Sequence, residues 1–146
     1  MKYSLVTKYK YMLRAIETRK VLALPNTFGN SFVSIEHGTL TLEFAYCWNG
    51  SSIPLKKLFR VLSLWMYDAD RYCKIASLAH DGLCQLIREG FLHRKYKPYI
   101  DRLYRDMCIE GGLPKWRADK RYQALRKAGD IGITPEKNPR GKIFEV

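Results

Sequence analysis

The apolar residues of this chain change their spacing once, and that change decides what the chain can fold into. In the first part, Ser31–Glu36 and Thr39–Phe44 alternate apolar and polar residues, as half-buried strands do. The dipeptide His37-Gly38 between them predicts a two-residue hairpin turn. Extended structure is also expected over Val21–Leu24, as a second strand followed by a Pro-Asn turn, and over Tyr3–Ile16.

After Pro54 the spacing becomes that of amphipathic helices. A first helix is indicated by the i, i+3, i+4, i+7 pattern of Leu55, Leu58, Phe59 and Leu62. A second is expected to begin at a cap on Asp68 or Asp70 and to end at Gly90. Its apolar face is made of Ile75, Leu78, Ala79, Leu83 and Leu86. A third helix should run from near Pro98 to Gly111, and a fourth from Pro114 to Gly129.

These elements predict an α+β protein, with a small antiparallel N-terminal sheet followed by a helical half of three to four helices. A length of 146 residues favours a single domain. Within it we expect a β-rich part with its loop at 1–54, a helical part at 55–129 and an irregular arm at 130–146.

The cysteines and the N-terminus indicate where the chain folds. Four cysteines are widely spaced and form no CxxC pair, so zinc-site spacing is absent. The N-terminus is polar and lysine-rich, and no apolar run is long enough to span a membrane. We therefore expect free thiols and synthesis in a reducing cytoplasm.

A strong positive charge limits the partners of this protein. Lys and Arg number 26 against 14 Asp and Glu, which gives a formal net charge of +12. Such a surface attracts nucleic acid, an anionic membrane face or an acidic protein. The basic residues concentrate between Arg94 and Lys127, as an anion-binding face or simply a solvated surface. The candidates for such a face lie on the fourth predicted helix: Arg117, Lys120, Arg121 and Lys127.

One constellation could carry chemistry. His80 and Asp81 are adjacent, so on a helix their side chains diverge by roughly 100° and serve different directions. Asp101 follows near the start of the next helix, and antiparallel helices joined through Gly90 would bring it to the imidazole. A carboxylate that holds one ring nitrogen while the other activates water is the arrangement of general-base catalysis. The alternative is a buried histidine that Asp101 satisfies within the core.

Cys84 offers a further alternative. It follows His80 by one helical turn, so a thiol–imidazole pair is geometrically possible. We favour a partly buried, inert cysteine.

Residues Ser77–Cys84, followed by Asp101, resemble the helix pair of secreted and prokaryotic calcium-dependent phospholipases. The resemblance implies that His80 is the general base, Asp81 a calcium ligand and Asp101 the residue that orients the imidazole. Carbonyl groups of the glycine-containing loop would complete the calcium site, at Trp48, Asn49, Gly50, Ser51 and Ser52. The loop precedes the helix by more residues than is usual in those enzymes, and their flanking disulfide cysteines are missing.

The order of motifs is closer to an uncharacterised family in tailed-phage and prophage genomes. That family pairs a W-D-G-x-S-x-P loop with L-x-H-D-x-L and a later helical Asp, which Trp48–Pro54, Leu78–Leu83 and Asp101 match. Asn49 stands where the family usually has an acidic residue, which removes one anionic ligand. The resemblance covers roughly residues 22–130. It implies a phage origin, in the host cytoplasm or associated with the virion, and leaves the activity open.

Three functions compete. The first is a calcium-dependent, phospholipase-like hydrolase acting on an anionic lipid. The second is a phage accessory or virion protein that works by protein contact. The third is a nucleic-acid-binding module in which basic residues alternate with Tyr99, Tyr104, Trp116 and Tyr122. The third is least favoured because the chain contains no recognised nucleic-acid motif.

Overall fold

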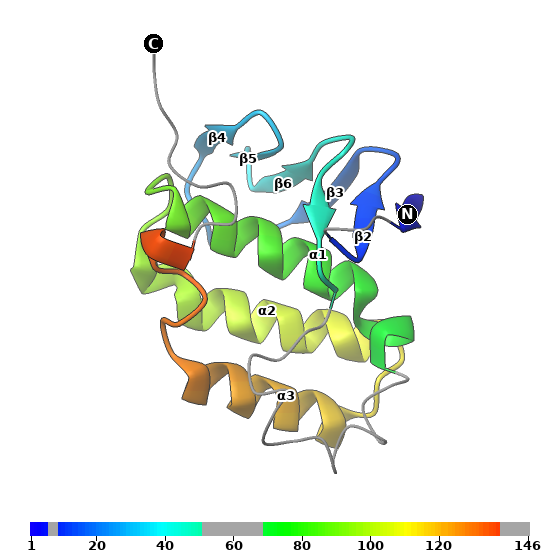
Figure 1. Cartoon of the computed structure of the whole chain (residues 1–146). Helices are drawn as coiled ribbons and strands as arrows, with labels where there is room; N and C mark the ends of the chain where they lie inside the picture. The colour runs from blue at the N-terminus through cyan, green and yellow to red at the C-terminus, as the bar shows by residue number, and fades with distance from the viewer. Residues whose placement is uncertain (6–8, 51–68, 138–146) are drawn as a thin grey trace.

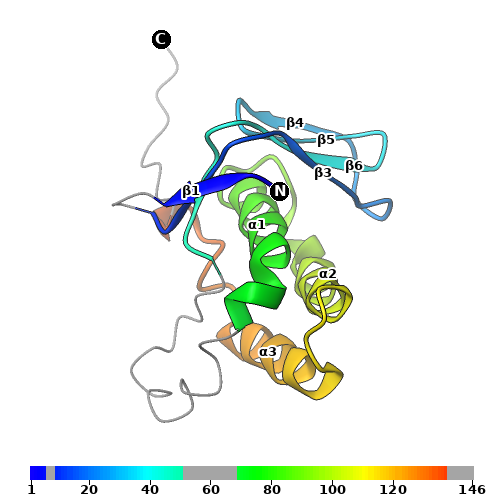
Figure 2. The same cartoon turned by 90° about the vertical axis from the view of Figure 1, so that its right-hand side faces the viewer.

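The computed structural model describes residues 1–5, 9–50 and 69–137, in which an N-terminal β region lies against a layer of three helices (Figure 1). Figure 2 shows α1 between the strands on one side and α2 and α3 on the other. The expected α+β architecture is confirmed. The helix predicted over Leu55–Leu62 and a cap at Asp68 lie outside the described residues.

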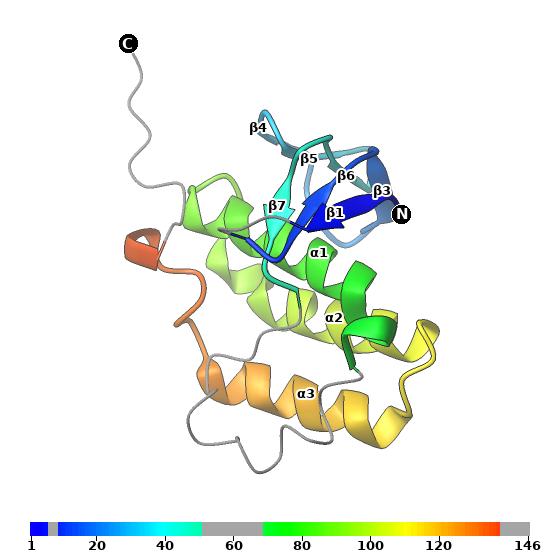
Figure 3. The ribbon, with the colours of Figure 1, turned by 45° about the vertical axis from the view of Figure 1, so that its right-hand side comes forward.

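The strands form two antiparallel sheets. The first has the order β1-β2-β7 and consists of Tyr3–Leu5, Tyr11–Leu13 and Cys47–Trp48. The second has the order β3-β6-β5-β4 and consists of Glu17–Lys20, Thr39–Leu42, Val33–Glu36 and Thr27–Asn30. In Figure 3, β7 passes in front of α1. The indole Nε1 of Trp48 donates to Ser77 Oγ on α1 at 3.3 Å, so β7 and α1 are in contact.

The hairpin of β5 and β6 is confirmed at residue level. His37 and Gly38 both have positive φ, 48° and 67°, as a two-residue turn matched to the twist of the strands requires. The backbone N–H of His37 donates to Asn26 Oδ1 at 2.8 Å, which fixes the turn. The apolar residues of this hairpin face α1 closely: a Cβ on Gly82 would lie 2.6 Å from Leu42 Cδ2, so a larger residue there would displace the Leu42 side chain.

The strand predicted over Val21–Leu24 is wrong. These residues form a turn between β3 and β4, closed by a hydrogen bond from Leu24 N–H to the Val21 carbonyl at 2.9 Å. Val21 and Leu24 are buried, whereas Leu22 is 79% exposed. A turn that buries two apolar residues has the same apolar sequence pattern as a short strand, so the pattern does not distinguish the two. Pro25 follows directly and, lacking an N–H, could not continue a strand within a sheet.

The helices are α1 (Ala69–Arg88), α2 (Lys97–Glu110) and α3 (Lys115–Ala128), with short 3₁₀ turns at Arg94–Tyr96 and Pro135–Lys137. Asp70 lies inside α1 and is therefore not its cap. The expected ends at Gly90, Gly111 and Gly129 are confirmed. After α1, Gly90 has φ 80° and Phe91 N–H donates to the Leu86 carbonyl at 2.9 Å, a glycine-based helix stop.

The core lies where α1 meets the strands and α2. Leu78, Leu83 and Leu86 are fully buried, as predicted, whereas Ile75 is 47% exposed and does not belong to the apolar face. Asp101 on α2 is the one carboxylate among the described residues that is fully buried. The fold therefore places a charged group where an apolar one would otherwise pack.

Candidate functional site

The predicted pair of His80 and Asp101 is present. His80 Nε2 on α1 lies 2.9 Å from Asp101 Oδ1 on α2, which is hydrogen-bond distance. The Asp101 side chain is fully buried and the His80 side chain is 12% exposed. Tyr104, one turn after Asp101, meets the imidazole edge-on with ring centres 5.3 Å apart. The dyad is thus held on two helices that pack directly against each other.

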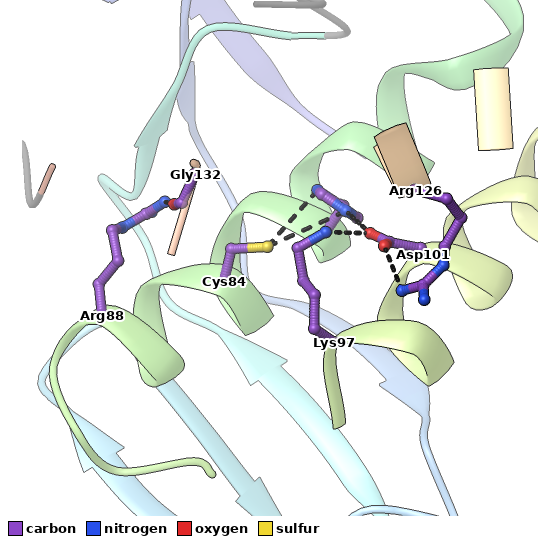
Figure 4. A network of polar contacts seen from close by, with 7 residues as sticks. Cys84, Arg88, Lys97, Asp101, Arg126 and Gly132 are labelled. Carbon is purple, nitrogen blue, oxygen red and sulfur yellow. Dashed lines mark hydrogen bonds and ion pairs between the residues drawn. The ribbon is translucent and has the colours of Figure 1, made fainter. Parts of the chain in front are cut away.

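Two cations that sequence reasoning did not identify also face Asp101 (Figure 4). Lys97 Nζ lies 2.5 Å from Oδ1, the oxygen that already meets His80, and Arg126 Nη1 on α3 lies 3.7 Å from Oδ2. Lys97 precedes Asp101 by four residues on one helix, a spacing that could have been recognised as an ion pair. No sequence signal points to Arg126, because its contact depends on how α3 packs on α2.

These partners keep Asp101 ionised. Burial alone raises the pKa of a carboxyl group, but the hydrogen bonds from His80 and Lys97 outweigh it and lower the pKa of Asp101. Oδ2 accepts no hydrogen bond from the described residues, although Arg126 stands nearby. The carboxylate is therefore stabilised mainly through Oδ1.

The imidazole of His80 is held in its charged form. Burial lowers its pKa, but the charge interaction with Cys84, the hydrogen bonds with Asp101 and Cys84 and the charge of Asp81 raise the pKa of His80 to about 10. At neutral pH the dyad is accordingly an imidazolium–carboxylate pair. To act as a base, His80 must first lose a proton, so activity of that kind would increase with pH.

Cys84 lies beside the imidazole ring of His80. Its Sγ is 3.7 Å from Nδ1 and 3.9 Å from Nε2 of His80. The residue is also 3% exposed. These features agree with a buried cysteine, and among the described residues the Cys84 thiol is the side-chain contact of Nδ1, whereas Nε2 also meets Asp101.

Asp81 faces the other way, toward the loop after β7. Burial raises the pKa of Asp81 to about 6, although His80, Arg88 and a hydrogen bond from the Asn49 backbone N–H lower it. The structure thus brings Asp81 and Asn49 together, through the Asn49 N–H and not through the carbonyl that the phospholipase resemblance implies. Trp48 is buried at 1% exposure, donates to Ser77 and anchors the loop by packing. Gly50 has φ 70°, which favours glycine at the bend.

A calcium ion would find an incomplete set of ligands in the described part of the chain. Calcium takes six to eight oxygen ligands, at roughly 2.4 Å. Asp81 supplies a carboxylate, but Asn49 presents an N–H to it, and no group of three or more His, Cys, Asp or Glu side chains suited to a metal occurs among residues 1–5, 9–50 and 69–137. Ser52 lies outside the described residues.

The four predicted anion-binding residues separate on α3. Lys120 and Lys127 are exposed, and Arg117 lies over the ring of Trp116 at 5.3 Å. Trp116 is itself 51% exposed. Arg121, in contrast, is 6% exposed and donates from Nη1 to Tyr104 Oη at 2.9 Å, so it does not belong to a docking face. Position 121 faces the protein interior although its residue is charged, because the long arginine side chain reaches the Tyr104 hydroxyl.

Comparison with known proteins leaves the site to be judged from its own geometry. No protein-family model, curated protein or solved structure matches this chain. Within the described residues, no helix has both the length and the apolar character needed to cross a membrane. The similarities to phospholipases and to the tailed-phage family stay predictions from sequence motifs.

Proposed function

We propose that the protein is a hydrolase of lipid esters that works through His80 and Asp101, with a phospholipase-like arrangement of groups. The observation that carries the proposal is the 2.9 Å contact between Nε2 and a fully buried carboxylate, which leaves Nδ1 facing the Cys84 thiol at 3.7 Å and no second carboxylate. This is what a general base requires: one nitrogen fixes the ring, and the other accepts a proton.

The reaction follows from those two nitrogens. With His80 neutral, Nε2–H donates to Asp101 and the Nδ1 lone pair takes a proton from water. The resulting hydroxide-like oxygen attacks the ester carbonyl carbon, and the bond to the alcohol oxygen breaks. The proton on Nδ1 then passes to that leaving oxygen, so the products are a carboxylic acid and an alcohol. Asp101 stabilises the imidazolium that forms between the two steps.

The proposal also includes a substrate class, anionic lipid, and a metal ion, calcium. A net charge of +12 favours anionic lipid over neutral lipid at the protein surface. On the phospholipase resemblance, Asp81 is proposed as a calcium ligand, since its carboxylate faces the backbone of the loop at Asn49. On the order of its motifs, we also propose a tailed-phage origin, with action in the host cytoplasm or in association with the virion.

A second candidate function is a non-catalytic phage accessory protein in which the dyad only stabilises the core. The observation that favours it is the pKa of His80, about 10, because an imidazolium at neutral pH is an ion-pair partner and not a base. In that case His80 and Asp101 would hold α1 and α2 together, and the basic surface would bind an acidic protein.

Fatty-acid release from phosphatidylglycerol vesicles separates the two functions. We expect release with calcium that increases with pH between neutrality and about pH 10, and that His80→Ala abolishes. His37→Asn is the matched control: it also removes an imidazole, but from an exposed turn with φ 48°, which asparagine tolerates. Release that survives His80→Ala, or no release from the folded wild type at any pH, would exclude the hydrolase and favour the accessory protein.

A further inference from the structure

The Cys84 thiol contacts the His80 imidazole, and the reaction proposed above gives it no role. Both residues lie on α1, one helical turn apart, and Sγ is nearer to Nδ1, at 3.7 Å, than to Nε2, at 3.9 Å. Nε2 in turn meets Asp101 Oδ1 at 2.9 Å. In Figure 4, dashed lines lead from the Cys84 sulfur to the imidazole and on to Asp101. Thiol, imidazole and carboxylate therefore form one continuous series.

Such a series is the arrangement of covalent catalysis. A nucleophile contacts a base, and a third group orients that base. The third group is present here, because the fully buried Asp101 holds Nε2 and is itself held by Lys97. Tyr104 packs edge-on against the imidazole from the other helix. The orientation of the ring therefore rests on groups other than Cys84, and the thiol can react without loss of that orientation.

A base in this position takes a proton from the thiol more readily than from water. An ordinary thiol has a pKa of about 8.5, against about 15.7 for water. Cys84 is 3% exposed and the His80 side chain 12%, so bulk water has little access to the ring. The 3.7 Å between Sγ and Nδ1 leaves no room for a water molecule between them. The first nucleophile that neutral His80 generates is therefore the Cys84 sulfur.

The charges that this proton transfer creates also stabilise each other. Burial lowers the pKa of His80, and the largest opposing effect is the charge interaction with Cys84, ahead of the hydrogen bond to Asp101. Because this attraction is reciprocal, the imidazolium stabilises the negative sulfur while it attacks. Asp101 is shared with Lys97 through Oδ1, so the sulfur supplies a second negative charge beside the ring.

We propose that Cys84 is the nucleophile of the reaction and that the acyl group passes through a thioester on its sulfur. The inference rests on the proposed hydrolase and adds a covalent intermediate to it. Nδ1 takes the proton of the thiol while Sγ bonds to the ester carbonyl carbon. The bond to the alcohol oxygen then breaks, and that oxygen takes the proton from Nδ1.

Water enters in the second half of the reaction. After the alcohol has left, neutral His80 takes a proton from water, and the water oxygen bonds to the carbonyl carbon of the thioester. The carbon–sulfur bond breaks, and the sulfur regains a proton from Nδ1. A carboxylic acid leaves, and the thiol and the neutral imidazole are restored. The activation of water by His80 thus acts on the thioester instead of the ester.

The thioester can be trapped on the whole protein with an activated ester, 4-nitrophenyl butyrate. Rapid-quench samples should contain a butyryl group on the Cys84 peptide, found by mass spectrometry and removed by neutral hydroxylamine, which cleaves thioesters. Cys47 is the internal control, because it is the more exposed thiol but donates to the Ala45 carbonyl at 3.4 Å. Acylation of Cys47 to the same extent as Cys84 would overturn the inference.

Substitution of Cys84 separates a nucleophile from a group that acts on the imidazole only through its charge. Because that charge raises the pKa of His80, Cys84→Ala should leave more of the ring neutral. If water attacks the ester directly, hydrolysis of phosphatidylglycerol by Cys84→Ala will equal or exceed that of the wild type, which overturns the inference. We expect kcat to fall by roughly a hundredfold or more. Cys73→Ala is the matched control, because it removes another buried thiol from α1.

A variant that does not fold is recognised by thermal unfolding. Cys84→Ser keeps the size of the side chain and should show the same fall in kcat, because a hydroxyl group is a much weaker acid than a thiol. A fall in kcat while the wild type carries no acyl group on Cys84 in rapid-quench samples would overturn the inference, since the residue would then act only through the fold.

The outcomes distinguish this inference from the proposed function. Fatty-acid release that depends on His80 but persists in Cys84→Ala overturns the nucleophile alone and leaves the hydrolase in place. An acyl group that forms on Cys84 in the wild type but not in His80→Ala, without fatty-acid release from vesicles, supports the nucleophile and removes the proposed lipid hydrolase.

Discussion

Asp101 and Asp81 lie on opposite sides of His80, and the protein treats these two carboxylates in opposite ways. Asp101, between α1 and α2, meets His80 and Lys97 through one oxygen, and its pKa is lowered. Asp81, facing the loop after β7, has its pKa raised to about 6. Asp101 is the more buried of the two. The comparison shows that the partners of a carboxylate, and not its burial alone, decide whether it is ionised.

The two residues therefore change stability with pH in opposite directions. Because the pKa of Asp101 is lowered on folding, its contribution is present above the ordinary value of 3.8 and is lost as pH falls through the lower folded pKa. Because the pKa of Asp81 is raised on folding, ionising it costs stability as pH rises from 3.8 through about 6. A single net pH profile hides these two effects, and substitutions separate them.

The largest effect is expected for Asp101→Asn. It leaves Lys97 and His80 as buried cations without a counter-charge, which costs about 3–5 kcal/mol. The measurement is the free energy of unfolding in urea at neutral pH. Asp106→Asn is the control, because Asp106 is 48% exposed and its pair with Arg105 should contribute about 1 kcal/mol or less. A loss in Asp101→Asn no larger than in this control would contradict the comparison.

Asp81→Asn should act in the opposite direction. At pH 7 it removes an unfavourable charge and keeps the acceptor for the Asn49 N–H, so we expect a gain of about 1–3 kcal/mol that fades near pH 4. Calcium should raise the melting temperature of the wild type and leave Asp81→Asn unchanged, by linkage of binding to folding. Destabilisation by Asp81→Asn at pH 7 would show that the carboxylate is satisfied. Absence of any calcium effect at millimolar concentration counts against the calcium proposal.

The cations of α3 also divide into a buried one and exposed ones, and we expect smaller effects on stability from substituting them. Arg121→Gln removes a buried donor to Tyr104 and should cost about 1–2 kcal/mol of stability. Lys120→Gln with Lys127→Gln should change stability by less than about 0.5 kcal/mol, because both side chains are exposed. For binding to anionic vesicles the order of the effects should be reversed: the lysine variants should bind more weakly than Arg121→Gln, and their binding should depend less on salt concentration. If the buried and exposed substitutions had equal effects on stability and on vesicle binding, the assignment of Arg121 to the interior and of Lys120 and Lys127 to a binding surface would be refuted.

Local patterns predicted much of the fold. The hairpin turn at His37-Gly38 and the helix ends at Gly90, Gly111 and Gly129 follow from backbone preferences of short segments, and all are confirmed. Val21–Leu24 was predicted as a strand because a buried turn and a buried strand share the same apolar residues. Arg121 was placed on the surface because sequence alone does not show which face of a polar helix meets Tyr104.

The candidate site was predictable only as far as spacing along the chain allows. His80 and Asp101 could be paired from two helices joined through Gly90, and Asp81 could be separated from His80 by helix geometry. Arg126 could not be found in this way, since its contact requires the position of a third helix. The protonation states were also beyond the sequence, because they depend on burial and on every charge around the dyad.

The most direct test of this account is a titration of the aspartate carboxyl carbons by ¹³C NMR, with Asp101 and Asp81 assigned through their asparagine variants. We expect Asp101 to remain ionised below its ordinary pKa of 3.8 and Asp81 to titrate near 6 in the same sample. His80→Ala should move the pKa of Asp101 upward, because it removes a hydrogen bond to the carboxylate. Two carboxyl groups that titrate together near 3.8, or a higher pKa for Asp101 than for Asp81, would contradict the account.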